Sequence, residues 1–172
     1  LHLLANGLPW AAGDEVLVVE GDFPATVLPW LGLAGRGVGV RSLPRDPAGG
    51  LDPEVLRRAA CPRTRLLCAS WVFSLSVDRL DLPAVAAVCR EQGVHWWLHS
   101  CGNNTDIMGD LAEVGLDVFH PVQKGTMDEV AIAREYGEVM TFLVGIDVQH
   151  TLQERDPWPF SNGTACVKRC GS

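Results

Sequence analysis

The sequence lacks any apolar run long enough to cross a membrane, and its start lacks the features of a secretory leader. A membrane-spanning helix needs roughly 20 consecutive apolar residues, and charged or turn-forming residues interrupt every apolar stretch of this chain well before that length. The first residues, LHLLANGLPW, have neither the charged flank nor the small-residue cleavage site of a signal peptide. These absences predict a soluble, cytoplasmic protein. Because the chain does not begin with methionine and its start is typical of a helix interior, we expect it to be part of something longer.

Positive charge is scarce as well. The formal net charge is −7, the acidic residues are scattered, and the lysines of the chain are Lys124 and Lys168. Nucleic acids and anionic membranes are bound through clustered lysine and arginine. The charge pattern therefore argues against both as partners, and the partner we expect is a small-molecule substrate.

Cysteine is present, but not in the pattern of a disulfide-rich domain. A chain of 172 residues can bury a core of normal size and has no need of disulfide cross-links. Cys61, Cys68 and Cys89 lie in apolar surroundings within predicted strands and helices. We expect these three to be buried, reduced thiols.

Strands and helices are predicted to alternate along the chain. The valine-rich run at residues 14–21 is typical of a buried parallel strand, and Asp81 and Gly93 mark the two ends of a helix at residues 82–92. This alternation predicts an α/β fold, a mainly parallel sheet of six or seven strands with helices on its faces, expected to be incomplete. Further strands are predicted at 38–43, 65–72, 94–98, 116–121 and 140–147, and further helices at 23–35 (kinked or late-starting because of Pro29), 53–60, 105–114 and 128–136.

The carboxyl ends of the strands are where functional groups are expected in such folds, whether the sheet is open or part of a barrel. Polar side chains with ligand or acid–base chemistry follow three of the predicted strands. They are His99 and Cys101 after one strand, His120 and Gln123 after the next, and Asp147 after the last.

Three segments carry a resemblance to a known family: GLPWAAGDEVLVVEGDFPATVLPW, GGLDPEVLRRAACPRTRLL, and SWV followed by RLDLPAVAAVCREQG. Through them, residues 1–94 resemble the class V aminotransferases, the pyridoxal phosphate-dependent family that includes the cysteine desulfurases. The resemblance implies that Phe23, just after the first strand, is the aromatic residue that stacks on the cofactor ring.

The same resemblance implies two groups that this chain lacks. The family continues from the strand at residue 94 into an aspartate that pairs with the pyridine nitrogen, and later into a lysine that binds the cofactor covalently. His99 takes the place of the aspartate, and Lys124 and Lys168 lie outside the family's lysine context. We therefore expect no covalent pyridoxal phosphate and no transamination by this chain alone.

A second resemblance begins near residue 94 and is carried by LHSCGNNTDIMGDLAEVGLDVFHPVQKGTMDEVAIAREYGEVMTFLVGIDVQHTL. This segment is similar to uroporphyrinogen decarboxylase and its cobamide methyltransferase relatives, which are (β/α)₈ barrels. The resemblance implies that His99 and Cys101 are two zinc ligands, with a third cysteine missing unless Cys166 or Cys170 supplies it. Such a zinc ion would hold a substrate thiol as the nucleophile. The alternative for the same residues is structural, with His99 hydrogen-bonded to a neighbouring loop and Cys101 a small buried residue at a helix start.

Together these observations predict three segments that can fold as one domain: a class V aminotransferase-like fragment at 1–94, a barrel-type fragment at 95–155 and an irregular tail at 156–172. The predicted function is that of a chimeric fragment without a complete active site, with pyridoxal phosphate as cofactor by resemblance alone. One alternative is a zinc-dependent, methyltransferase-like enzyme that uses His99 and Cys101. The other is a non-catalytic α/β protein that forms homo-oligomers through unpaired sheet edges.

Overall fold

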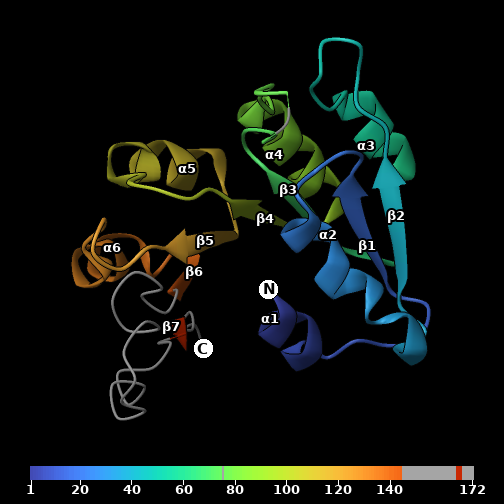
Figure 1. Cartoon of the computed structure of the whole chain (residues 1–172), viewed down its shortest axis with the longest axis horizontal. Helices are drawn as coiled ribbons and strands as arrows, with labels where there is room; N and C mark the ends of the chain where they lie inside the picture. The colour runs from blue at the N-terminus through green and yellow to red at the C-terminus, as the bar shows by residue number, and fades with distance from the viewer. Residues whose placement is uncertain (75, 145–165, 168–172) are drawn as a thin grey trace. The chain divides into compact units, whose positions relative to one another are not determined.

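The computed structural model describes residues 1–74, 76–144 and 166–167 of the chain (Figure 1). The chain divides into two compact units, Leu1–His99 and Ser100–Ser172. Each unit has helices and strands of its own. The α/β fold predicted from the alternation of elements is confirmed.

The first unit is built on four parallel strands in the order β2-β1-β3-β4. Valine and leucine dominate β1, which is buried along nearly its whole length because a central strand of a parallel sheet is covered on both faces. Strand β2 lies at an edge of this open sheet and is more exposed. The strands span β1 Glu15–Val19, β2 Gly39–Leu43, β3 Thr64–Ser70 and β4 His95–His99.

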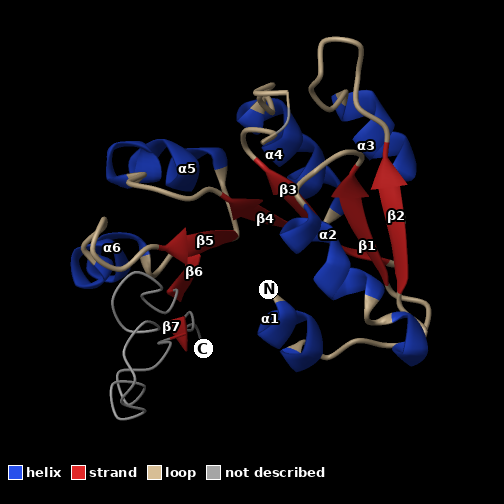
Figure 2. Ribbon diagram, in the orientation of Figure 1, coloured by secondary structure: helices blue, strands red, loops and turns tan. Residues whose placement is uncertain are grey.

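Helices cover both faces of this sheet (Figure 2). Crossovers between parallel strands are right-handed, and the step from β1 to β2 runs across the sheet in the opposite direction to the steps from β2 to β3 and from β3 to β4. Consequently α2 lies on one face, against β1 and β3, while α3 and α4 pack together on the other. The helices are α1 His2–Gly7, α2 Pro24–Leu31, η1 Ala34–Arg36, α3 Pro53–Ala59 and α4 Leu82–Gln92.

Local signals account for where these helices begin and end. The Asp81 carboxylate accepts a hydrogen bond from the Ala84 N–H at the start of α4, and Gly93, with φ of 64°, ends it. This helix has the bounds that the sequence predicts. Helix α2 is shorter than the predicted 23–35: it continues through Pro29, ends at Leu31 before Gly32, and is followed by the short η1 helix.

Three tryptophans pack edge to face inside the first unit. The ring of Trp30 in α2 lies 6.2 Å from that of Trp10 and 6.3 Å from that of Trp97 in β4, with interplanar angles of 77° and 74°. Trp30 and Trp97 are buried, and this row joins α2 to the sheet. Edge-to-face packing is a preferred arrangement of aromatic pairs.

The second unit contains two parallel strands, β5 and β6, and a short strand β7 that is antiparallel to β6. Phe119 and Phe142 on neighbouring strands are buried together with Met108 and Leu111 of α5. Of the tail predicted at 156–172, the structure describes residues 166–167, which form strand β7. The elements are η2 Thr105–Ile107, α5 Met108–Val114, β5 Val118–Val122, α6 Glu129–Tyr136, β6 Thr141–Val144 and β7 Cys166–Val167.

No helix within the described ranges is both long enough and apolar enough to cross a membrane.

Candidate functional site

The strand order of the first unit marks one position at which a ligand is expected. From β1 the chain moves to β2 on one side, and from β3 it moves to β4 on the other side. Open α/β sheets bind ligands beyond the carboxyl ends of the two strands where the direction reverses. Here that position, which we call the switch point, lies between the residues that follow β1 and the end of β3.

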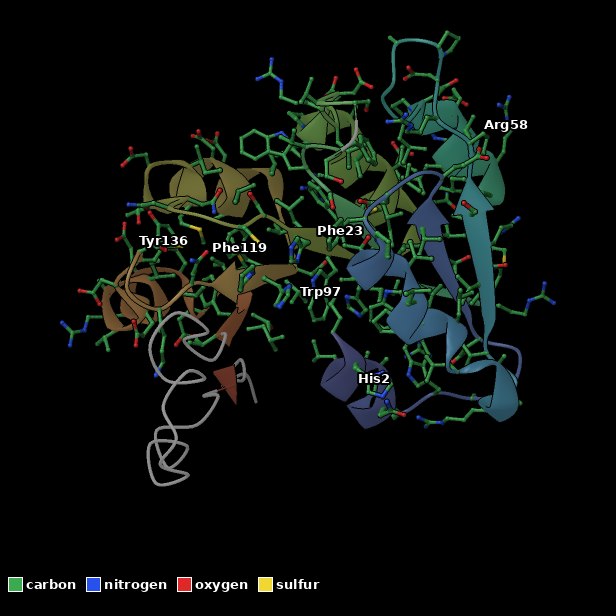
Figure 3. The ribbon with its side chains drawn as sticks, viewed as in Figure 1. His2, Phe23, Arg58, Trp97, Phe119 and Tyr136 are labelled. Carbon is green, nitrogen blue, oxygen red and sulfur yellow. The ribbon has the colours of Figure 1, made fainter. Side chains whose placement is uncertain are left out.

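Phe23 lies at the switch point, directly before helix α2 (Figure 3). Its side chain is 50% exposed, whereas Phe73, Phe119 and Phe142 are buried in the core. The backbone of Phe23 is extended, with φ of −61° and ψ of 136°, and Pro24 occupies the first position of the helix. The structure therefore presents the one half-exposed phenylalanine ring of the described residues at the place where the sequence predicts a stacking group.

Asp22 lies next to Phe23 and is only 8% exposed. Its Oδ1 accepts a hydrogen bond from the Phe23 N–H at 2.6 Å, and its Oδ2 accepts one from the Ser70 N–H at 2.8 Å. Ser70 is the last residue of β3 and is itself buried. The carboxylate thus links the exit of β1 to the end of β3 across the switch point.

His99 is the last residue of β4 and lies opposite Ser70 in the register of the two strands. Burial lowers the pKa of the His99 imidazole, and the Asp22 carboxylate acts in the opposite direction with a smaller effect. The imidazole is therefore neutral at pH 7. A neutral imidazole stands at the strand end where the family resemblance implies a carboxylate.

Arg45 stands beside this group of residues, after strand β2. Its guanidinium donates a hydrogen bond to the Ser76 hydroxyl at 2.6 Å, lies 3.5 Å from a carboxylate oxygen of Asp78, and sits 5.0 Å from the centre of the Phe73 ring. A Cβ on Gly21, just before Asp22, would be 3.9 Å from the Arg45 side chain. These contacts hold the loop after β3 against the exits of β1 and β2.

The predicted metal ligands His99 and Cys101 are placed in different units, His99 in the first and Cys101 in the second. Cys101 is exposed, which corrects the alternative of a small buried residue. The part of the chain that the structure describes contains no group of three or more histidine, cysteine, aspartate or glutamate side chains able to hold a metal ion. The side chain of Cys166 and the whole of Cys170 lie outside the described residues.

The loop that carries Cys101 is held by internal hydrogen bonds. The Asn104 side chain donates to the carbonyl oxygens of Ser100 and Gly102 at 3.2 and 3.1 Å, and the Gln123 side-chain oxygen accepts from the Gly102 N–H at 3.1 Å. Gln123 thus has a structural role in the second unit.

The other predicted strand-end groups are His120 and Asp147. His120 lies within β5, where its carbonyl oxygen accepts a hydrogen bond from the Ser100 N–H at 2.9 Å. Asp147 lies outside the described residues.

The predicted buried thiols also need one correction. Cys68 and Cys89 are buried, but Cys61 is only partly buried, at the turn between α3 and β3.

Comparison with known proteins identifies the family. The family model described as aminotransferase class V matches residues 1–121, more than half of the chain. The chain belongs to the class V aminotransferase family.

Relatives within this family are cysteine desulfurases. The probable cysteine desulfurase of Methanothermobacter thermautotrophicus is 26% identical over 152 residues, an alignment that covers 84% of this chain and 38% of the relative. The probable cysteine desulfurase of Pseudomonas aeruginosa is 33% identical over 124 residues, which cover 69% of this chain and 30% of the relative. The class V chain described here therefore spans well under half the length of these relatives.

Solved structures of similar fold include a cysteine desulfurase and a cystine C-S lyase. The cysteine desulfurase CsdA from Escherichia coli superimposes with a TM-score of 0.57 at 21% identity, over 67% of this chain and 29% of that protein. A variant of C-DES with glycine covalently linked to its PLP cofactor gives a TM-score of 0.54 at 22% identity, over 67% of this chain and 32% of that protein. At these identities the likeness establishes the fold.

The comparisons change the interpretation of residues 95–155. The class V family model continues past the predicted boundary at residue 94, through β4 and into β5. It gives no support to a uroporphyrinogen decarboxylase-like segment, and neither it nor the described residues support zinc. The two families could be confused here because both have a helix, a glycine and a buried strand at this point, so the local pattern around residues 93–99 fits either.

The residues at the switch point fit pyridoxal phosphate in part. The half-exposed ring of Phe23 offers a flat apolar surface to a cofactor ring. The first unit contains no lysine, because the lysines of the chain are Lys124 and Lys168, and so it supplies no side-chain amine for covalent attachment. The strand end at His99 likewise lacks the carboxylate that would keep a pyridine nitrogen protonated.

Proposed function

We propose that the first unit binds pyridoxal phosphate without a covalent bond, with the cofactor ring stacked on Phe23. The observation that carries this proposal is the half-exposed Phe23 ring at the switch point of a class V aminotransferase fold. The other phenylalanines of the described residues are buried in the core, whereas Phe23 is half exposed at the position where a ligand is expected.

The substrate class we propose is a small molecule with an amino group, as expected for a family that works on amino acids. When bound, pyridoxal phosphate supplies a ring that can take up electron density from such a substrate. In this chain Phe23 would hold the face of the ring, and neutral His99 would leave the ring nitrogen without a charged partner. We therefore expect binding without efficient transamination or desulfuration by this chain alone.

Titration with pyridoxal phosphate tests the proposal. The purified chain is mixed with increasing cofactor, and binding is followed by the absorbance of the cofactor and by quenching of tryptophan fluorescence. Phe23→Ala is expected to weaken binding about tenfold, since stacking on an aromatic side chain contributes about 1–3 kcal/mol and 1.4 kcal/mol is a factor of ten.

Leu28→Ala is the matched control, because Leu28 is a 60% exposed apolar side chain on helix α2, which Phe23 directly precedes. It should leave the affinity unchanged. Absence of saturable binding, or equal losses in both variants, would refute the stacking role of Phe23.

The non-covalent part of the proposal has its own test. After borohydride treatment, dialysis under denaturing conditions should remove all the cofactor, and the mass of the chain should be unchanged. A reduced adduct on Lys124 would contradict it.

Two finer predictions from the sequence remain proposals. One is the alternative in which residues 95–155 derive from a barrel family and His99 and Cys101 bind zinc, for which the described residues supply no group of three ligands. The other is homo-oligomer formation through open sheet edges, for which the exposed strand β2 is the first candidate. Metal analysis and light scattering on the purified chain test them.

A further inference from the structure

The exit of strand β1 is fixed by a carboxylate. Gly21, with φ of 71°, turns the chain after β1, and the Asp22 N–H donates back to the Val19 carbonyl oxygen at 3.2 Å. This turn directs the Asp22 side chain toward the end of β3, where its Oδ2 accepts the Ser70 N–H. A carboxylate buried to this extent is retained only where hydrogen bonds replace its hydration.

The position of Asp22 is anchored in the sheet. Ser70 is paired in register with His99 of β4, so its backbone is held in the parallel sheet, and its N–H donates to Asp22. A hydrogen bond between a charged acceptor and a backbone N–H is stronger than a neutral one. The Asp22 carboxylate therefore fixes the backbone of Phe23, the next residue in the chain, relative to the end of β3.

The backbone of Phe23 is held on both sides. Its N–H donates to Asp22 Oδ1 at 2.6 Å, and its carbonyl oxygen accepts from the Thr26 N–H at 2.9 Å and from the Thr26 hydroxyl at 2.7 Å. Thr26 is fully buried. The ring is half exposed, yet it projects from a backbone that is fixed by hydrogen bonds before and after it.

We propose that Asp22 is a positioning residue: its carboxylate, by joining the N–H groups of Phe23 and Ser70, sets the direction in which the Phe23 ring projects at the switch point. Its consequence for pyridoxal phosphate rests on the proposed function, but the positioning of the ring does not. Asp22 need not touch a ligand to have this effect.

Asp22→Asn isolates the effect with little change in volume. Asparagine has one acceptor oxygen, and its amide group would face one of the two N–H donors, so one bond is lost. Asp14→Asn is the matched control. Asp14 is 9% exposed, lies at the opposite end of the same strand, and accepts a backbone hydrogen bond from the Ala11 N–H at 2.8 Å.

Fluorine NMR measures the ring directly and without a cofactor. The chain is labelled with 4-fluorophenylalanine, and the Phe23 resonance is identified by its loss in Phe23→Leu. Asp22→Asn is expected to shift or broaden this resonance while the resonances of the buried rings stay in place, and Asp14→Asn is expected to change none of them. An unaltered Phe23 resonance in a folded Asp22→Asn chain would overturn the proposal.

If the Asp22→Asn chain does not fold, Asp22→Glu provides a second test of the positioning role. It keeps the charge and both acceptor oxygens but adds one methylene, so the link between Phe23 and Ser70 is displaced and not removed. The same resonance is expected to move, and an unchanged position again overturns the proposal.

A double-mutant cycle extends the test to pyridoxal phosphate. Asp22→Asn is expected to weaken binding about fivefold, the equivalent of one hydrogen bond, in the presence of Phe23 and to have no effect in the Phe23→Ala background. Equal losses in both backgrounds would mean that Asp22 does not act through Phe23. If the unaltered chain binds no pyridoxal phosphate, the proposed function fails, and the fluorine spectra alone decide the role of Asp22.

Discussion

At the scale of single residues, the cysteines of the first unit differ sharply in their surroundings. Burial raises the pKa of the Cys68 thiol to about 12, an effect that the indole of Trp30 only partly offsets. A hydrogen bond from the Thr64 hydroxyl lowers the pKa of Cys61, which is partly exposed. The thiolate is the reactive form of cysteine, so these two thiols should differ strongly in reactivity.

Timed alkylation with iodoacetamide at pH 7.5 checks this difference. Cys61 and the exposed Cys101 are expected to be modified in the folded chain, whereas Cys68 should react only after unfolding in urea. Peptide mass spectrometry gives the extent at each site. Modification of Cys68 at the rate of Cys101 in the folded chain would show that the core around β3 is open.

His99 makes a second residue-scale prediction, on stability and pH. Burial lowers its pKa in the folded chain below the usual value near 6.5. The folded state therefore binds this proton less readily than the unfolded state, so stability is full above about pH 6.5 and falls as the pH drops toward the folded pKa. Urea unfolding at pH 7.5 and pH 5.5 should show a larger loss for the unaltered chain than for His99→Gln. Equal losses would mean that His99 is not buried as a neutral group.

The site illustrates which residues a sequence can reveal. Phe23 stands out because it follows a strand directly and because the resemblance to class V aminotransferases points to it. Asp22 was missed as a functional candidate, although it also follows the strand, because its partner Ser70 is 48 residues away in the chain. No local pattern reports a carboxylate shared between two strand ends.

At the scale of elements, the helices show where local signals suffice. Helix α4 has the predicted bounds because an N-cap aspartate and a left-handed glycine define its two ends. The length of α2 was predicted too long, since apolar residues continue at helical spacing beyond Leu31 while the backbone changes to a 3₁₀ turn. Apolar spacing alone does not distinguish these two backbones.

Gly93→Ala tests the end of α4. A residue with a Cβ is strained in the left-handed conformation that Gly93 adopts at φ of 64°, and the expected loss is about 1–2 kcal/mol of unfolding free energy. Urea denaturation measures this loss. Gly35→Ala is the control, because a Cβ on Gly35 meets no atom within 4 Å and its φ is not left-handed, and it should cost little. Similar losses in both variants would argue against strain at the helix end.

At the scale of the whole molecule, the relation to the family sets the limits of function. The chain matches class V aminotransferases over residues 1–121 and spans 38% of a desulfurase relative. The alternation of strands and helices was enough to predict the fold class. It was not enough to predict how far the family match extends, which was placed at residue 94 and reaches residue 121. The junction predicted near residue 94 rested on a strand pattern that two families share.

The zinc content of the purified chain is a prediction at the scale of the whole molecule. A catalytic zinc site needs three protein ligands, and the described ranges provide no group of three. The purified chain is therefore expected to contain less than one zinc per chain by atomic emission, with no change in His99→Ala. One tightly held zinc that is lost in both His99→Ala and Cys101→Ala would instead support the methyltransferase-like alternative.

The row of tryptophans in the first unit has a spectroscopic consequence. Trp10, Trp30 and Trp97 come from segments far apart in the chain, and their rings are close enough for the electronic transitions of neighbouring indoles to couple. Near-ultraviolet circular dichroism of the chain should therefore contain an indole signal that exists only while α2 rests on the sheet. Loss of this signal would report that helix α2, which follows Phe23, has come away from the sheet.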